Sequence, residues 1–149
     1  MILVDADACP VKEEILRVSG RYALAVKFVA NGWMRLPESP LIERVVVTEG
    51  LDRADDWIAE HSAPGCIVVT ADIPLADRCV KAGARVLGPD GRAFTPASIG
   101  NVLATRNLLT ALREAGEIRG GGRPFTKQDR SAFLQALDTA VQAIRRTGR

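Results

Sequence analysis

Aspartate side chains follow three apolar segments of this chain. They are Asp5 and Asp7 after residues 2–4, Asp52, Asp55 and Asp56 after residues 44–48, and Asp72 after residues 66–70. Carboxylates that are brought together repel one another, and burying them together is costly unless a cation lies between them. Mg²⁺ and Mn²⁺ prefer such oxygen ligands, and an ion held in this way activates water for phosphodiester hydrolysis. The aspartates therefore predict a metal site of the kind used in phosphodiester hydrolysis.

Most of these aspartates also have a local explanation that needs no metal. Asp5 and Asp7 favour the start of a loop, and Asp52 is suited to cap the helix that follows it. At 100° per residue, Asp56 points toward solvent, whereas Asp55 lies at the edge of an apolar arc and is better placed to enter a cleft. Because three separate segments deliver acids, we favour a shared metal site. Its predicted ligands are Asp5, Asp7, Asp52, Asp55 and Asp72.

The segments that carry the aspartates are predicted strands, separated by helical patterns. Short apolar runs bounded by turn residues are typical of buried strands, and apolar residues at helical spacing indicate helices. Strands are expected at 2–4, 23–30, 44–48, 66–70 and 85–87, and helices at 10–20, 52–61, 73–82, 95–115 and after Thr126. This alternation predicts a doubly wound α/β domain with a mostly parallel sheet flanked by helices. In such sheets, ligands bind beyond the carboxyl ends of the strands.

Length and composition limit the class of protein. A chain of 149 residues is expected to form a single domain over 1–149. Three cysteines without a CxxC pair exclude a disulfide scaffold and a thiolate zinc site, and a single histidine excludes chemistry that needs two. The chain has no apolar run of ~18 residues and no recognisable signal peptide. We therefore expect no membrane span and a cytoplasmic location.

Charge is divided unevenly along the chain. Residues 1–90 hold ten Lys/Arg against fourteen Asp/Glu, a net charge of −4, whereas residues 91–149 hold ten against four, a net charge of +6. An acidic half beside a basic half is suited to a cation site next to a surface for anions. Uneven surface charge without a function explains the same numbers.

The basic part contains a predicted phosphate contact. Thr126 and Asp129 have the spacing of a capping box at the start of the last helix. Arg123, Lys127 and Arg130 gather at that start, and both helix N-termini and arginines bind phosphate. These three residues are predicted to bind the substrate backbone, although a solvated helix face is an equal alternative. The glycines at 120–122 predict that 116–125 is a mobile loop before this helix.

Other catalytic patterns are weak. The glycine run is not followed by the Lys-Ser/Thr of a phosphate-binding loop, and no GxGxxG occurs. Cys9 lies near a predicted helix start, which lowers a thiol pKa, but neighbouring acids raise it again. A half-buried thiol explains Cys9 better than a nucleophile does.

Four motifs resemble those of a known family. They are Asp-Ala-Asp-Ala-Cys-Pro-Val-Lys at 5–12, Gly-Leu-Asp-Arg-Ala-Asp-Asp-Trp-Ile at 50–58, Val-Val-Thr-Ala-Asp-Ile-Pro-Leu-Ala at 68–76 and Gly-Arg-Pro-Phe-Thr-Lys-Gln-Asp-Arg-Ser at 122–131. With these motifs, the chain resembles the YaiI/YqxD family of small bacterial proteins over essentially its whole length. The resemblance implies a PIN-like fold, related to metal-dependent ribonucleases, but no settled activity.

The PIN-like pattern is matched best by Asp5, Asp55 and Asp72, with Asp7, Asp52 and Asp77 as additional acids. PIN-like sites often have Glu on the middle helix, where Asp55 is shorter by one methylene. The resemblance thus implies that Asp5, Asp55 and Asp72 ligate the ion, either directly or, for the shorter Asp55, through water.

We therefore expect a Mg²⁺- or Mn²⁺-dependent nuclease that acts on single-stranded or structured RNA. Asp7 and Asp52 would orient water or act as outer ligands, and Thr70 would hold a carboxylate or a phosphate by a hydrogen bond. One alternative is a phosphatase of the haloacid-dehalogenase type with Asp5 as the nucleophile. The other is a non-catalytic RNA- or protein-binding module. The sequence makes no prediction about oligomeric state.

Overall fold

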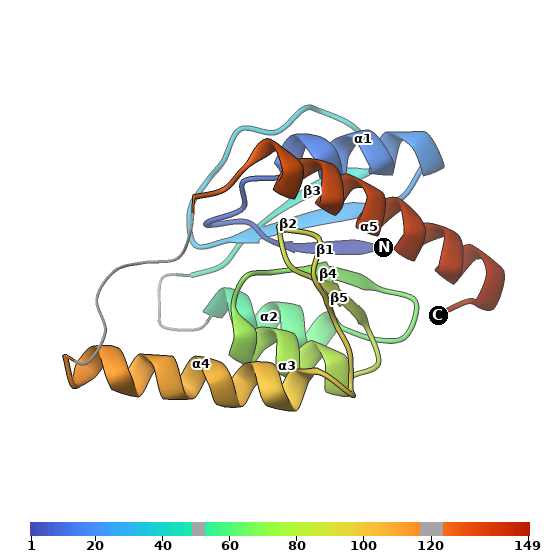
Figure 1. Ribbon diagram of the computed structural model, residues 1–149. Coiled ribbons are helices and arrows are strands. Elements are labelled where there is room, and N and C mark those ends of the chain that lie inside the picture. Colours follow the sequence, from blue (N-terminus) through green and yellow to red (C-terminus); the bar gives the residue numbers. More distant parts are fainter. Residues whose placement is uncertain (49–52, 117–123) are drawn as a thin grey trace.

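The computed structural model describes residues 1–48, 53–116 and 124–149, which form one sheet with helices on both faces (Figure 1). The strands are β1 (Ile2–Asp5), β2 (Val26–Ala30), β3 (Ile42–Val46), β4 (Ile67–Val69), β5 (Arg85–Leu87) and β6 (Ala93–Phe94). The helices are α1 (Lys12–Tyr22), α2 (Arg53–His61), α3 (Ile73–Lys81), α4 (Ile99–Glu114) and α5 (Lys127–Thr147). Asp52 and Arg123 lie outside the described residues, as does most of the predicted loop at 116–125.

The sheet is doubly wound about its central strands. The strand order is β3-β2-β1-β4-β5-β6, and all neighbours are parallel except β5 and β6, which are antiparallel. The chain moves outward from β1 to β3, returns to place β4 beside β1, and moves outward again to β6. This is the predicted α/β arrangement, and it is consistent with a PIN-like fold.

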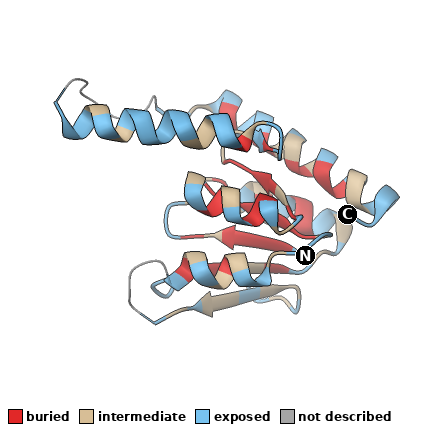
Figure 2. Ribbon diagram, turned by 90° about the horizontal axis from the view of Figure 1, so that it is seen from below, coloured by how far each residue is buried: buried red, intermediate tan, exposed pale blue. Residues whose placement is uncertain are grey.

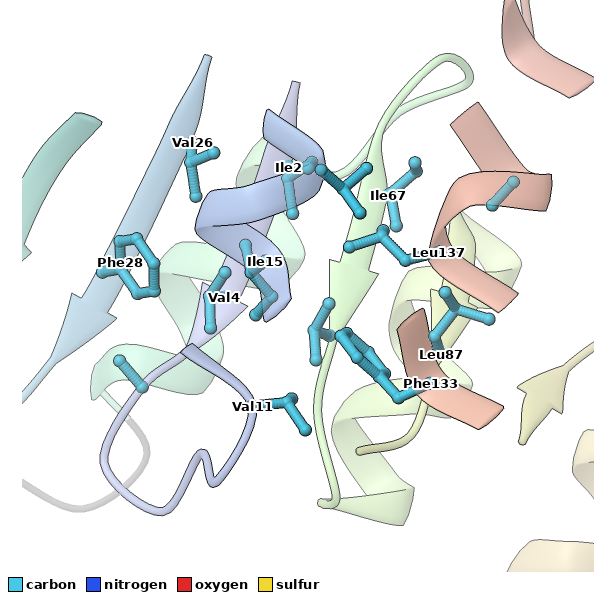
Figure 3. Packing of buried hydrophobic residues seen from close by; sticks show 14 of the residues in the cluster. Ile2, Val4, Val11, Ile15, Val26, Phe28, Ile67, Leu87, Phe133 and Leu137 are labelled. Carbon is cyan, nitrogen blue, oxygen red and sulfur yellow. The ribbon is translucent and has the colours of Figure 1, made fainter. Parts of the chain in front are cut away.

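The central strands are buried because both faces of the sheet are covered. Helices α1 and α5 cover one face, and α2 and α3 cover the other, with α4 packed on α3 (Figure 1). Ile2 and Val4 point into the core beneath α1 and α5, whereas Leu3 points into the core beneath α2 and α3. Figure 3 shows Ile15 of α1 and Phe133 of α5 over the first of these cores. The continuous apolar runs of parallel strands follow from this double burial.

Helix α1 extends beyond the predicted stop at Gly20. It continues to Tyr22 and ends at Ala23, which has a left-handed φ of 53° and donates its amide to the Ser19 carbonyl. A glycine within a helix costs only about 1 kcal/mol relative to alanine, which tertiary contacts offset. One such contact is the hydrogen bond from the Tyr22 hydroxyl to Asp138 of α5, at 2.8 Å.

The short strand β6 and the turn that connects it to β5 were not predicted from the sequence. The turn approaches α5 closely at Gly91, which has a φ of +88°. A Cβ added there would lie 2.7 Å from the backbone carbon of Ala132. Only glycine permits both this backbone conformation and this approach. The close approach positions the β5–β6 turn against the start of α5.

The start of α5 has the predicted capping box. The Asp129 amide donates to the Thr126 hydroxyl at 3.1 Å, and the Thr126 amide donates to the Asp129 carboxylate at 2.9 Å. Across 1–48, 53–116 and 124–149, no helix combines the length and the apolar character needed to cross a membrane.

Replacing Gly91 or Gly20 with alanine should change the free energy of unfolding in opposite directions. Gly91→Ala should lower the free energy of unfolding by about 2 kcal/mol or more, because a left-handed alanine is strained and its methyl group meets the Ala132 backbone. Gly20→Ala is the control, because a Cβ there meets open space within a helix. It should raise the free energy of unfolding by about 0.5–1 kcal/mol. Urea denaturation measures both, and equal effects of the two variants would contradict the close approach.

Candidate functional site

Strands β1 and β4 form the switch point of the sheet. They are adjacent and parallel, and the register pairs Val4 with Val69. Beyond these paired residues, β1 ends at Asp5 and β4 is followed by Thr70. From here the chain winds toward β2 on one side and toward β5 on the other. Doubly wound sheets bind ligands in the crevice that this reversal opens.

Thr70 joins the ends of the two strands by hydrogen bonds. Its side chain is buried, and the residue is only 1% exposed. The hydroxyl donates to Oδ2 of Asp5 at 2.8 Å and accepts from the backbone amide of Asp72 at 3.0 Å. A single hydroxyl therefore orients the Asp5 carboxylate and the turn that carries Asp72.

Asp72 is the N-cap residue of α3. Its Oδ1 accepts a hydrogen bond from the Leu75 amide at 2.9 Å, and Pro74 in the first turn favours the start of the helix. Oδ2 of Asp72 and Oδ1 of Asp5 accept no hydrogen bond from the described residues. Each of these two carboxylates thus has one oxygen engaged by the protein and one available to a ligand.

Burial and neighbouring charge act on Asp5. Burial raises the pKa of the Asp5 carboxyl, and the charges of Asp72 and Asp7 raise it further, while the Thr70 hydrogen bond lowers it. The net direction is upward, so the ionised form of Asp5 is disfavoured in the folded protein. A cation placed beside this carboxylate would reverse that penalty.

Asp7 lies in the β1–α1 connection, and Asp55 lies in α2. Asp7 is exposed, and both of its oxygens lie 3.2 Å from the amide of Asn31, just after β2. Asp55 is half-buried in the first turn of α2, a helix that contacts β1 and β2. Burial raises the pKa of the Cys79 thiol, and the charges of Asp55 and Asp5 raise it further.

Two further acids form ion pairs on the helices. Asp56 is paired with Arg78 at 2.9 Å on the exposed side of α2, in keeping with its predicted orientation toward solvent. Asp77 is paired with Lys81 at 2.8 Å along α3. These pairs account for both carboxylates without a metal.

The basic residues before and within α5 are placed differently from one another. Lys127 is exposed at the first position of the helix. Arg130 donates to the carbonyl oxygen of Pro10 at 2.6 Å, lies 3.4 Å from Glu14, and stacks over the ring of Phe125. This Arg130 contact attaches α5 to the β1–α1 connection, a role that the sequence did not indicate.

The donor atoms fit a hard cation that keeps part of its water shell. Within 1–48, 53–116 and 124–149, no three His, Cys, Asp or Glu side chains are gathered closely enough to cage a metal ion. Mg²⁺ is usually held by only one or two carboxylates, with water and substrate phosphate as its other ligands. The available oxygens of Asp5 and Asp72 match this donor set.

A cavity of about 410 Å³ lies beside the switch point. Its walls come from the β1–α1 and β4–α3 connections, the β5–β6 turn and the start of α5, and they include Ala71, Ile73, Arg92 and Phe125. Ala71 stands between Thr70 and Asp72, so the cavity adjoins the acidic residues. The β5–β6 turn was not predicted as part of the site, although Pro-Asp-Gly at 89–91 is a strong turn signal.

Cys9 does not have the environment of a nucleophile. Burial raises the pKa of its thiol more than the hydrogen bond from the Val11 backbone lowers it. All three cysteines are free thiols.

These features define an α/β protein with carboxylates at the switch point of a doubly wound sheet. The family described as "Uncharacterized BCR, YaiI/YqxD family" matches residues 3–143. The chain belongs to this family, as its motifs indicated.

Proteins named UPF0178 are similar to the chain over nearly its whole length. One from Rhodopseudomonas palustris (strain BisB18) is 58% identical over 148 residues, covering 99% of this chain and 96% of its own. One from strain HaA2 is 61% identical over 145 residues, covering 97% and 88%, and one from Brucella ovis is 60% identical over 148 residues, covering 99% and 92%. No solved structure matches the chain.

The raised pKa of Asp5 predicts how Asp5→Asn changes the stability of the protein in the absence of metal. Because the folded state holds the Asp5 proton more tightly than the unfolded state, the ionised carboxylate destabilises the fold at pH values above the raised pKa. Asp5→Asn should therefore be more stable than wild type at pH 7.5. This advantage should vanish below pH 3.8, the ordinary value, where Asp5 is protonated in both states. Asp56→Asn, in the exposed pair with Arg78, should show little gain, and a loss of stability in Asp5→Asn at pH 7.5 would contradict the assignment.

Thr70→Val tests the hydrogen bonds between the strand ends. The valine has nearly the same shape but leaves the Asp72 amide and Asp5 without the hydroxyl, which should cost about 1–3 kcal/mol. Thr70→Ser retains the hydroxyl and serves as the matched control. Urea denaturation compares the three proteins, and a smaller loss in Thr70→Val than in Thr70→Ser would show that the hydroxyl is not what matters.

Proposed function

We propose that this protein is a Mg²⁺- or Mn²⁺-dependent nuclease that hydrolyses phosphodiester bonds, with RNA as its substrate class. The observation that supports it best is the placement of Asp5 and Asp72 at the ends of adjacent central strands, joined through the Thr70 hydroxyl. Two carboxylates held near each other, each with an available oxygen, are an arrangement that a cation stabilises.

Oδ1 of Asp5 and Oδ2 of Asp72 are the atoms that would hold the ion. Asp7, in the β1–α1 connection, and Asp55, in α2, are the further acids expected to take part. A bound divalent ion would supply activated water and neutralise the charge that develops on the phosphate. Thr70 restricts the Asp5 carboxylate to one orientation, so the ligand oxygen is positioned before any ion or substrate arrives.

The N-cap role of Asp72 supports the same proposal. Because its Oδ1 accepts a hydrogen bond from the Leu75 amide, the rotation of the carboxylate is restricted. The amides at the α3 start also place partial positive charge behind the carboxylate. A carboxylate held by the start of a helix in this way is suited to bind a cation.

Metal binding and cleavage test the proposal directly. In calorimetric titrations with Mn²⁺, wild type should bind, and Asp5→Asn and Asp72→Asn should each lose binding, because each removes a charged ligand. The same two variants should lose Mn²⁺-dependent cleavage of a labelled single-stranded RNA by at least about a hundredfold. Asp56→Asn is the control and should retain both properties, since Asp56 is paired with Arg78.

Two results would overturn the proposal. Unchanged Mn²⁺ titrations in Asp5→Asn and Asp72→Asn would remove the shared site and favour a binding module. A stable beryllium fluoride adduct on Asp5 would point instead to an aspartyl-phosphate intermediate and therefore to a phosphatase, because metal-assisted hydrolysis by water forms no covalent enzyme intermediate.

A further inference from the structure

Helix α4 is the most exposed helix of the fold. Figure 2 shows its surface as largely exposed, and its main contact in the described part is with α3. Between this helix, the start of α3 and the β5–β6 turn lies a groove of about 470 Å³. We define the α4 groove by its lining residues Ile73, Arg92, Val102, Arg106, Leu109 and Arg113, together with Asn101 and Thr105.

The α4 groove carries three positive charges and no carboxylate. Arg92, Arg106 and Arg113 are all exposed, and none of them forms an ion pair with any described residue. Their contacts are weak: Arg92 lies 6.0 Å from the centroid of the Phe94 ring, and Arg106 lies 3.3 Å from the Asn107 side-chain oxygen. By contrast, Arg78 and Lys81 on the neighbouring α3 are both paired with aspartates. The charges of the groove are therefore available to an anionic partner.

Helix-end electrostatics explain only part of this arrangement. Arg113 lies in the last turn of α4, where a cation complements the helix dipole. Arg106 lies in the middle of the helix and Arg92 lies in the β5–β6 turn, so neither gains from that effect. Arg106 and Arg113 are two helical turns apart, about 10 Å along the axis at 1.5 Å per residue, and consequently lie on one side of the helix.

The α4 groove is continuous with the cavity beside the acidic residues. Ile73 and Arg92 line both spaces, and Ile73 directly follows Asp72. An extended polyanion could thus lie on the arginines of α4 and continue past Arg92 to the switch point. The apolar side chains of Ile73, Val102 and Leu109 offer contact area to unpaired bases in the same groove.

We infer that the α4 groove binds the backbone of a single-stranded nucleic acid, with phosphates on Arg92, Arg106 and Arg113 and the strand directed toward Asp5 and Asp72. This inference rests on the proposed nuclease function and specifies where its substrate lies. Guanidinium groups bind phosphate oxygens through paired hydrogen bonds, and the lack of any carboxylate in the lining favours a partner with repeated negative charge.

The test compares two double variants with the same change in net charge. Arg106→Gln with Arg113→Gln removes two charges from the groove. Arg17→Gln with Arg146→Gln removes two exposed charges from α1 and α5, on the opposite face of the sheet. Glutamine is a good helix former, so all four positions should keep their helices. Binding of a fluorescein-labelled 12-nucleotide single-stranded RNA is measured by anisotropy, in EDTA to prevent cleavage and across a range of salt concentrations.

The double variant Arg106→Gln with Arg113→Gln should bind the RNA about tenfold more weakly at low salt. The slope of the logarithm of its binding constant against the logarithm of salt concentration should be smaller by about 1.4, which corresponds to two lost phosphate contacts. The control variant should remain close to wild type. Arg92→Gln alone should reduce the slope by about 0.7 and provides the same test if the double variant fails to fold. A duplex of the same sequence should bind more weakly, because its bases are not available to the apolar side chains.

Equal affinities and slopes in the groove and control variants would overturn the inference, and equal binding of poly-glutamate would overturn its nucleic-acid specificity. These outcomes are separate from those of the proposed function. Cleavage with unchanged binding in the groove variant would contradict the groove alone. Groove-dependent binding without any Mn²⁺-dependent cleavage by wild type would contradict the nuclease and support the groove as a binding surface.

Discussion

The hydroxyl of Thr70 connects the two central strands at the point where both of them end. The hydroxyl donates a hydrogen bond to the Asp5 carboxylate and accepts one from the Asp72 amide in the turn before α3. The positions of Asp5 and Asp72 therefore depend on one buried side chain. Burying a carboxylate beside other acids is unfavourable, and the raised pKa of Asp5 is the consequence. Packing of β1 on both faces supplies the stability that makes this arrangement tolerable.

The elements around the switch point are attached to one another by specific contacts. Arg130 of α5 binds the Pro10 carbonyl in the β1–α1 connection, and Gly91 allows the β5–β6 turn to approach the backbone of the same helix. These contacts form one side of the cavity beside the acidic residues. The last helix thus contributes to the site through its first turn, while its later turns cover the core with Phe133 and Leu137 (Figure 3).

The fold places acids of the first half of the chain near arginines of the second half. The strands of the first half bring Asp5 and Asp72 together at the switch point, where the charge of Asp72 acts on Asp5. Three arginines of the second half lie along α4 and the β5–β6 turn, in a groove that reaches the same region, and they form no ion pair with any described residue. An anion attracted by the arginines would meet a cation held by the acids, which is the electrostatic requirement for cleaving a charged phosphodiester.

Local patterns in the sequence were sufficient for the order of strands and helices except β6, for the capping box of α5 and for the family. The apolar runs of β1 and β4, the spacing of Thr126 and Asp129, and the four motifs all lie within short stretches, where near neighbours determine the structure. Gly20 wrongly predicted the end of α1, because a local pattern does not include distant contacts. The helix extends to Tyr22, which contacts Asp138 of α5, far away in the sequence. The ligand roles of the aspartates and the phosphate contacts of Arg123, Lys127 and Arg130 stay predictions.

Tertiary structure alone decided which of these side chains meet. Thr70 and Asp5 are separated by 65 positions, and Arg130 and Pro10 by 120. The sequence predicted that Thr70 holds a carboxylate or a phosphate, but not that the partner is Asp5, and it did not predict the Arg130 contact. The β5–β6 turn joined the site because Gly91 lets it approach α5, and Arg92 then connects the cavity to the α4 groove. Periodicity determines which face of an element is buried, whereas the crossing of the chain at the switch point determines which polar ends lie side by side.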